Sequence, residues 1–233
     1  EDILAHLRQY FDMEEVLLGK KVLITAGPTR EAIDPVRFLS NQSSGKMGVA
    51  LAEACAEAGA EVELILGPGS AAPPHHPQVH TTTVQTAAEM YEAARRHWPG
   101  MDAGIMAAAV ADYRPRQVLK EKLKKSGKNM QLELVRTPDI AAALGSQKRP
   151  GQVLVGFALE TEREAENAQD KLRRKNFDFI VLNSLRDKGA GFQTDTNKVT
   201  LFFRTGEAHP LPLKSKKEVA RDICAALADH LKS

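Results

Sequence analysis

The stretch Lys21-Val-Leu-Ile-Thr-Ala-Gly-Pro-Thr-Arg-Glu-Ala-Ile-Asp-Pro-Val-Arg-Phe-Leu-Ser-Asn-Gln-Ser-Ser-Gly-Lys-Met-Gly48 decides the fold of this chain. Its apolar start predicts a buried strand over 21–26. The Ala-rich segment that follows predicts a helix ending at Gly59, and the next apolar run predicts a strand over 61–66. This β-loop-α-β order is typical of the first unit of a doubly wound, nucleotide-binding sheet.

The loop between this strand and this helix is unusually long. Roughly twenty residues form it, whereas such connections usually take about two to six. It is polar and follows the carboxyl end of the strand, where such sheets bind ligands. Its last part enters a helix N-terminus, whose free N–H groups and dipole favour an anion. We therefore expect Ser43, Gly45 and Lys46 to face phosphate groups; a serine N-cap beside a solvated lysine is the alternative.

Two familiar nucleotide motifs are excluded. A P-loop would need a glycine where Ser40 stands and a hydroxyl where Met47 stands. The dinucleotide fingerprint fails because Ser43 occupies its first glycine position, and the second strand ends without the acidic residue that binds an NAD ribose. A nicotinamide cofactor is therefore not expected.

Three blocks of this stretch, 24–31, 34–38 and 40–48, resemble bacterial phosphopantothenate–cysteine ligase, also called phosphopantothenoylcysteine synthetase. The block Ala108-Ala-Val-Ala-Asp-Tyr-Arg114 extends the resemblance, and further blocks carry it over nearly the whole chain. The resemblance implies an α/β fold, with a Rossmann-like, mainly parallel sheet flanked by helices and a small antiparallel dimerisation element. In most bacteria this enzyme is the C-terminal half of a bifunctional coenzyme A biosynthesis protein.

The resemblance also implies a reaction. CTP would activate 4′-phosphopantothenate as an acyl-cytidylate, and L-cysteine would then displace CMP to give phosphopantothenoylcysteine. The implied cofactor is Mg²⁺, held mainly by the nucleotide phosphates, with Asp112 as a candidate ligand; FMN is not expected in this fragment. The implied assembly is a homodimer, and no nucleic-acid or membrane partner is expected.

Specific residues take roles by this resemblance. Asn41 would donate its amide to the acyl carbonyl, and Ala109 would give a backbone contact there. Arg37 would bind the distal phosphate of phosphopantothenate, and Lys122, in the basic run 120–128, would contact the nucleotide. The implied nucleotide site comprises Ser43, Gly45, Lys46, Met106, Ala107, Ala108, Asp112, Lys122, Pro138, Asp139, Ile140, Ala141, Phe157, Lys171 and Lys175.

Each of these residues also has an ordinary structural interpretation. Asp112 could cap a turn, Phe157 could be core, and Lys171 and Lys175, four residues apart, could share a solvated helix face. Thr137 could cap a helix with Pro138 in its first position. From composition alone, the basic run 120–128 is expected to be a solvated stretch.

The remaining patterns complete a parallel sheet. Strands are predicted at 21–26, 61–66, 79–84, 103–111, 153–158 and 179–183, with antiparallel pieces near 131–135 and 199–213 outside the sheet. Helices are predicted over 86–97, with Thr86 and Glu89 forming a capping box, and over 162–175 and 216–231.

Composition adds little about function. The chain has 233 residues, 42% of them hydrophobic and 27% charged, with a net charge of +2. These values are ordinary for a soluble globular protein. Cys55 and Cys224 fall in Ala-rich helical stretches, so we expect buried, reduced thiols and a cytoplasmic protein. His75 and His76, adjacent in a polar loop, are expected to be solvated rather than metal-bound.

The predicted organisation has two parts. Residues 1–18 would be an amphipathic linker helix from a fused N-terminal, flavin-dependent decarboxylase half, or alternatively a tag scar. Residues 19–233 would be the synthetase domain, with a flap at about 116–130. Two rival functions stay open: an NAD(P)-dependent oxidoreductase, and a non-catalytic nucleotide-binding module whose basic run binds RNA.

Overall fold

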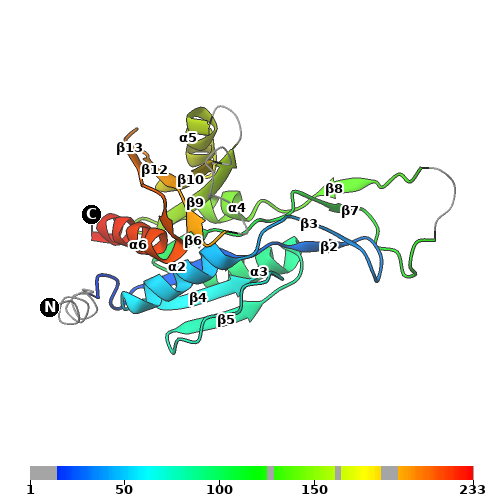
Figure 1. Ribbon diagram of the computed structural model, residues 1–233, viewed down its shortest axis with the longest axis horizontal. Coiled ribbons are helices and arrows are strands. Elements are labelled where there is room, and N and C mark those ends of the chain that lie inside the picture. Colours follow the sequence, from blue (N-terminus) through cyan, green and yellow to red (C-terminus); the bar gives the residue numbers. More distant parts are fainter. Residues whose placement is uncertain (1–14, 125–128, 161–163, 185–193, 233) are drawn as a thin grey trace.

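The protein is built around one mixed sheet (Figure 1). A computed structural model describes residues 15–124, 129–160, 164–184 and 194–232, so most of the predicted linker helix and part of the predicted flap lie outside the described residues. The eight strands run in the order β13-β12-β10-β9-β6-β1-β4-β5. The parallel strands are β1 (Lys21–Ala26), β4 (Glu61–Leu66), β5 (Val79–Thr83), β6 (Ala103–Met106), β9 (Val153–Glu160) and β10 (Phe179–Ser184).

This strand order creates a crevice. From β1 the chain adds β4 and β5 on one side, then returns to place β6, β9 and β10 on the other. The order therefore reverses between β1 and β6, and open α/β sheets bind ligands at the carboxyl ends of the strands beside such a reversal. The predicted Rossmann-like architecture is confirmed, and the long loop after β1 begins at this point.

Helices cover both faces of the sheet. One face carries α2 (Lys46–Glu57) and α6 (Lys216–Lys232), which pack in the same core as Ile24 of β1. The other face carries α3 (Ala87–His97), α4 (Ile140–Ser146) and α5 (Glu164–Arg174), which pack in the same core as Leu23 of β1. Successive strand residues point to opposite faces, so one strand feeds both cores. The Thr86–Glu89 capping box at α3 is confirmed. A short 3₁₀ helix, η1 (Trp98–Gly100), follows α3.

The last two strands of the sheet correct one prediction. β12 (Val199–Phe203) pairs antiparallel with β10, and β13 (Ala208–Pro210) pairs with β12, so the 199–213 hairpin extends the sheet rather than lying outside it. Val199 and Leu201 alternate into the core beside β10, at 2% and 4% exposure. Burial of this apolar face favours pairing with the sheet edge.

Short antiparallel pieces form an arm that projects from the sheet (Figure 1). The loop after β1 contains the hairpin β2 (Arg30–Ala32) and β3 (Phe38–Ser40). Beside it lie β7 (Tyr113–Pro115) and β8 (Leu134–Arg136), the observed form of the strand predicted at 131–135. β11 (Thr196–Asn197) and β14 (Lys214–Ser215) pair separately, next to the start of α6.

The strand predicted over 103–111 ends at Met106. Beyond it the chain leaves β9 and follows the end of β1 and the start of the next loop: the amide of Ala107 donates to Thr25 O at 3.1 Å, and that of Ala109 donates to Gly27 O at 2.9 Å. Small residues allow this backbone-to-backbone approach. Because β9 continues to Glu160 without this neighbour, a gap opens between β6 and β9 at the carboxyl edge of the sheet.

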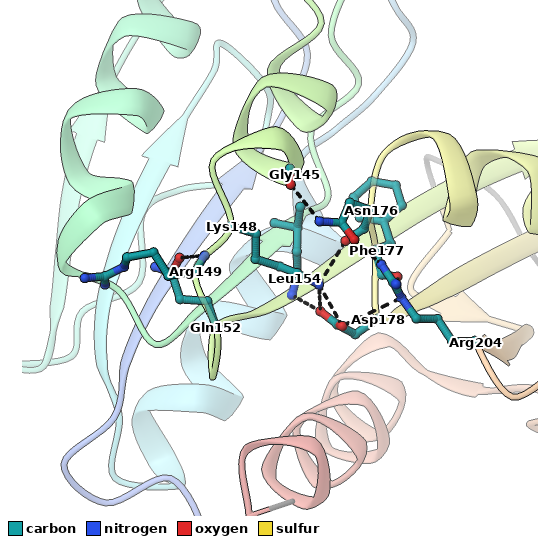
Figure 2. A network of polar contacts seen from close by, with 9 residues as sticks. All are labelled: Gly145, Lys148, Arg149, Gln152, Leu154, Asn176, Phe177, Asp178 and Arg204. Carbon is teal, nitrogen blue, oxygen red and sulfur yellow. Dashed lines mark hydrogen bonds and ion pairs between the residues drawn. The ribbon is translucent and has the colours of Figure 1, made fainter.

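A polar network fixes the loop that leads into β10 (Figure 2). Asp178 accepts two hydrogen bonds from Lys148 Nζ at 2.8 Å and one from the amide of Leu154 at 2.7 Å. Asn176, in the left-handed region at φ 54°, donates to Gly145 O at 2.8 Å. A Cβ on Gly145 would come within 2.0 Å of Lys175 O, so α4 lies directly against the loop that carries Lys175.

Candidate functional site

A cavity of about 690 Å³ opens at the carboxyl ends of β1, β6 and β9. Thr25, Met106 and Phe157 line it from these three strands, and the first turns of α2 and α4 line its sides. We call it the large pocket. It occupies the gap left where the chain turns away after Met106, and its volume is in the range of small-molecule sites.

The large pocket gathers the predicted nucleotide residues. All of them except Lys122 line it, as does Ala109. The lining members are Ser43, Gly45, Lys46, Met106, Ala107, Ala108, Asp112, Pro138, Asp139, Ile140, Ala141, Phe157, Lys171 and Lys175. The chain therefore brings together residues from five separate segments of the sequence.

The start of α2 is shaped by two glycines. Gly45 is the N-cap residue at φ 84°, in the left-handed region that favours glycine, and it provides no side-chain cap; Ser44 Oγ accepts from the amide of Lys46, the first helical residue, at 3.4 Å. The alternative of a serine N-cap is therefore wrong. A Cβ on Gly48 would meet Ala26 Cβ at 2.3 Å, so the first turn of α2 lies directly on the end of β1. This turn carries no acidic residue, which leaves its positive end uncompensated from within the helix.

α4 is capped differently from the prediction. Its N-cap residue is Asp139, whose Oδ1 accepts from the amide of Ala142 at 3.0 Å and from Lys175 Nζ at 3.0 Å. Thr137 instead donates its hydroxyl to Ala111 O at 2.6 Å and so ties the start of α4 to the loop after β6. Lys175 lies just beyond α5, with its charge paired to Asp139 at the pocket wall.

Asn41 lines a second cavity, of about 540 Å³. We call it the small pocket; Arg30 and Phe38 also line it, with the guanidinium of Arg30 over the Phe38 ring at 4.7 Å. The two pockets share Ser43, Ser44 and Lys46 and therefore adjoin at the start of α2. Asn41 Nδ2 donates to Ala109 O at 3.0 Å and Val110 O at 3.1 Å, which connects the small pocket to the wall of the large one.

Arg37 and Lys122 line neither pocket. Arg37 lies in the arm, where Nη2 donates to Asp34 at 2.6 Å and to Leu123 O at 2.7 Å. The amide of Leu123 donates to Asp34 at 3.1 Å, so the Asp34–Arg37 pair holds the residue next to Lys122. Desolvation acts to raise the pKa of Asp34, but hydrogen bonds from Arg37 and from the backbone outweigh it and hold that pKa well below its usual range.

Three residues at the α6 end of the large pocket were not predicted. Asn197 is 1% exposed and Lys216 is 7% exposed, and both line the pocket. Asn183, at the carboxyl end of β10, also lines it, and its buried Oδ1 is the one unpartnered side-chain atom of that kind in the described chain. Buried polar atoms are usually paired. This acceptor therefore suits a ligand N–H or O–H.

The donor set fits Mg²⁺ only as a companion of phosphate. Within the described ranges, no cluster of three or more His, Cys, Asp or Glu side chains is placed to hold a metal. Two carboxylates line the large pocket, those of Asp112 and Asp139, and Asp139 is already engaged with Lys175. Mg²⁺ commonly binds through one or two carboxylates together with substrate phosphates. Asp112 would supply such a ligand.

Comparisons with known proteins identify relatives of this chain. The family described as the DNA/pantothenate metabolism flavoprotein C-terminal domain matches residues 17–231. A cysteine/cysteine sulfinic acid decarboxylase from an unknown prokaryotic organism is 47% identical over 96% of this chain and 63% of its own length. The coenzyme A biosynthesis bifunctional protein CoaBC of Bacillus subtilis is 50% identical over 91% of this chain and 52% of its own length.

A solved structure covers nearly the same span. The crystal structure of the C-terminal domain of a CoaBC protein superposes with a TM-score of 0.80 at 46% identity, covering 94% of this chain and 99% of that one. The chain thus spans between about half and two thirds of these two curated relatives. No helix in the described ranges is long and apolar enough to cross a membrane.

Proposed function

This chain belongs to the family of the DNA/pantothenate metabolism flavoprotein C-terminal domain, and from that membership we propose that it is a phosphopantothenate–cysteine ligase. It joins 4′-phosphopantothenate to L-cysteine with CTP as the activating nucleotide, and it releases CMP and pyrophosphate. In the full-length protein, a flavin-dependent decarboxylase half precedes it, in keeping with relatives named as bifunctional.

The observation that carries the proposal is the contact between the two pockets at Ser43, Ser44 and Lys46. A ligase of this type must hold a nucleotide and an acid side by side. CTP would occupy the large pocket, with its phosphates toward the start of α2, where free N–H groups favour anions. Phosphopantothenate would occupy the small pocket, whose cationic lining residues are Arg30 and Lys46.

The chemistry needs activation because a carboxylate has no adequate leaving group for attack by an amine. In the first step, a carboxylate oxygen of phosphopantothenate attacks the α-phosphorus of CTP, and pyrophosphate leaves. In the second, the amine of cysteine attacks the acyl carbon, CMP leaves and the amine loses a proton. Positioning and charge stabilisation by the chain would supply the catalysis.

Roles follow from position. Asn41 is the residue of the small pocket whose amide reaches Ala109 and Val110 of the large one. It would release one of these carbonyls and donate that N–H to the acyl oxygen as cysteine attacks. Phe157, at the wall, would stack on the base, and Lys171 and Lys175 would lie near it. Mg²⁺, carried by the nucleotide phosphates and Asp112, would neutralise their charge.

Arg37 and Lys122 would act from the arm. A second copy of the chain would bring its own arm toward the phosphopantothenate, with Arg37 on the distal phosphate. Apolar side chains exposed on the arm favour such a contact: Val36 is 58% exposed, Val118 58% and Phe38 47%. Sedimentation of the purified chain would show a dimer, and polar substitution of Val36 and Val118 would weaken it.

Pyrophosphate release measured with CTP or ATP, with and without 4′-phosphopantothenate and cysteine, tests the function. We expect release to need phosphopantothenate and to be faster with CTP, and we expect mass spectrometry to find phosphopantothenoylcysteine only when cysteine is present. Absence of release in every mixture would overturn the proposal. Titrations with NADH and with RNA, both expected to show no binding, address the oxidoreductase and RNA-binding alternatives.

A further inference from the structure

Two lysines and one aspartate meet at the α6 end of the large pocket, which also adjoins the start of α2. Lys46 Nζ, from α2, donates to Asp195 Oδ1 at 2.6 Å. Lys216, the first residue of α6, donates its backbone amide to Asp195 O at 2.9 Å and its ammonium to Thr194 O. Lys46 and Lys216 line the pocket, whereas the Asp195 side chain is 85% exposed.

Positive charge is in excess at this end of the pocket. Among the described residues, the carboxylate of Asp195 faces two ammonium groups, and the positive end of the α2 dipole adds to their charge. Burial lowers the pKa of Lys216, and the neighbouring charge of Lys46 lowers it further. The hydrogen bond from Lys46 lowers the pKa of Asp195, so this carboxylate stays ionised. A buried ammonium beside a like charge is costly unless an anion compensates it.

We propose that Asp195 is a stand-in for the ligand: a diphosphate or longer phosphate chain displaces its carboxylate from Lys46 and binds between Lys46 and Lys216. That this chain belongs to the nucleotide rests on the proposed function; the anion site itself does not. Displacement is easy because the Asp195 side chain is largely solvated and exposed ion pairs contribute little. Phosphate oxygens carry more charge and more acceptors than one carboxylate, so they satisfy both lysines at once.

Titration calorimetry with inorganic pyrophosphate tests the site without any reaction. Asp195→Asn removes the competing charge, so we expect pyrophosphate to bind about threefold more tightly. Asp229→Asn, an equal charge change on the outer part of α6, is the matched control and should leave the affinity unchanged. Lys216→Gln should weaken binding at least about tenfold, whereas Lys217→Gln, at a lysine whose side chain is 74% exposed, should not.

Lys216 is buried, so its variant must be shown to fold by circular dichroism. Lys46→Gln, at a half-exposed position, serves as the second variant and should also weaken binding about tenfold. Unchanged or weaker pyrophosphate binding in Asp195→Asn would overturn the proposal, as would full affinity in Lys46→Gln. A protein that binds pyrophosphate as expected yet forms no phosphopantothenoylcysteine would refute the proposed function and leave the anion site standing.

Discussion

Arg37 holds Asp34 with two nitrogens of its guanidinium, Nε at 2.9 Å and Nη2 at 2.6 Å. Asp34 is 3% exposed and also accepts from the backbone amides of Val36, Arg37 and Leu123. This single carboxylate therefore joins the turn at the tip of the β2–β3 hairpin to the segment that carries Lys122. It is a structural centre of the arm, whatever Arg37 does with a substrate.

Asp34→Asn should destabilise the protein in a pH-dependent way. The native pKa of Asp34 is depressed, so its contribution is fully present above the unfolded value of about 3.9 and declines as the pH falls below it toward the native pKa. We expect a lower urea midpoint for Asp34→Asn at pH 7 and a smaller difference from wild type near pH 3. Asp229→Asn is the control, and an equal deficit at both pH values would contradict this explanation.

Asn41→Asp should separate the two chemical steps. A carboxylate cannot donate to the acyl oxygen, and it would face the carbonyls of Ala109 and Val110 that now accept from Asn41. We expect pyrophosphate release to remain detectable while phosphopantothenoylcysteine formation falls by about 10²- to 10³-fold. Quantitative mass spectrometry of the acyl-cytidylate and the product measures both. The exposed Gln147→Glu should behave as wild type, and normal product formation by Asn41→Asp would remove Asn41 from the mechanism.

Gly48→Ala should destabilise the start of α2. The new Cβ would lie 2.3 Å from Ala26 Cβ, and the displacement this forces costs about 1–3 kcal/mol. Alanine's better helix propensity, worth up to about 1 kcal/mol, offsets only part of that. Gly100→Ala is the matched control because nothing lies within 4 Å of its added Cβ. Chemical unfolding measures both variants, and equal stabilities would show that α2 shifts without cost.

Cys55 and Cys224 should resist alkylation in the folded protein. Their sulfurs lie 3.0 Å apart between α2 and α6, both side chains are buried, and the hydrogen bond with Cys55 and burial raise the pKa of Cys224. The reactive thiolate is therefore scarce as well as inaccessible. Iodoacetamide at pH 8 should label neither native thiol but both thiols in urea, as read by intact mass. Rapid native labelling, or a native mass lower by two hydrogens, would contradict the expected reduced and buried pair.

The parallel strands could be predicted because each is a short apolar run in a repeating α/β pattern. The predicted strand 103–111 was too long, because small apolar residues are equally compatible with a strand and with a non-strand segment that packs against a neighbouring loop. The β12 edge could not be placed because alternating burial does not say which strand it will join. The N-cap residue of α4 is Asp139 and not Thr137, because the hydroxyl of Thr137 donates a hydrogen bond to Ala111 O instead.

Site residues divide in the same way. Those within recognisable blocks, such as Ser43 and Asp112, could be assigned to one ligand before their proximity was known. Asn183, Asn197 and Lys216 carry no local pattern, since only the packing of α6 and β10 brings them to the pocket. The structural role of Arg37 had a signal that was missed: Asp34 followed by proline is typical of a turn, and its side chain accepts from the next amides.

Thr25 on β1 and Lys216 on α6 line the same cavity, although nearly the whole chain separates them. During translation, all six parallel strands leave the ribosome before α6 does. A nascent chain at that stage has its sheet but not its last anion-facing wall, and the apolar side of α2 has not yet met its partner helix. The cavity would thus gain its complete lining only after synthesis has passed the start of α6.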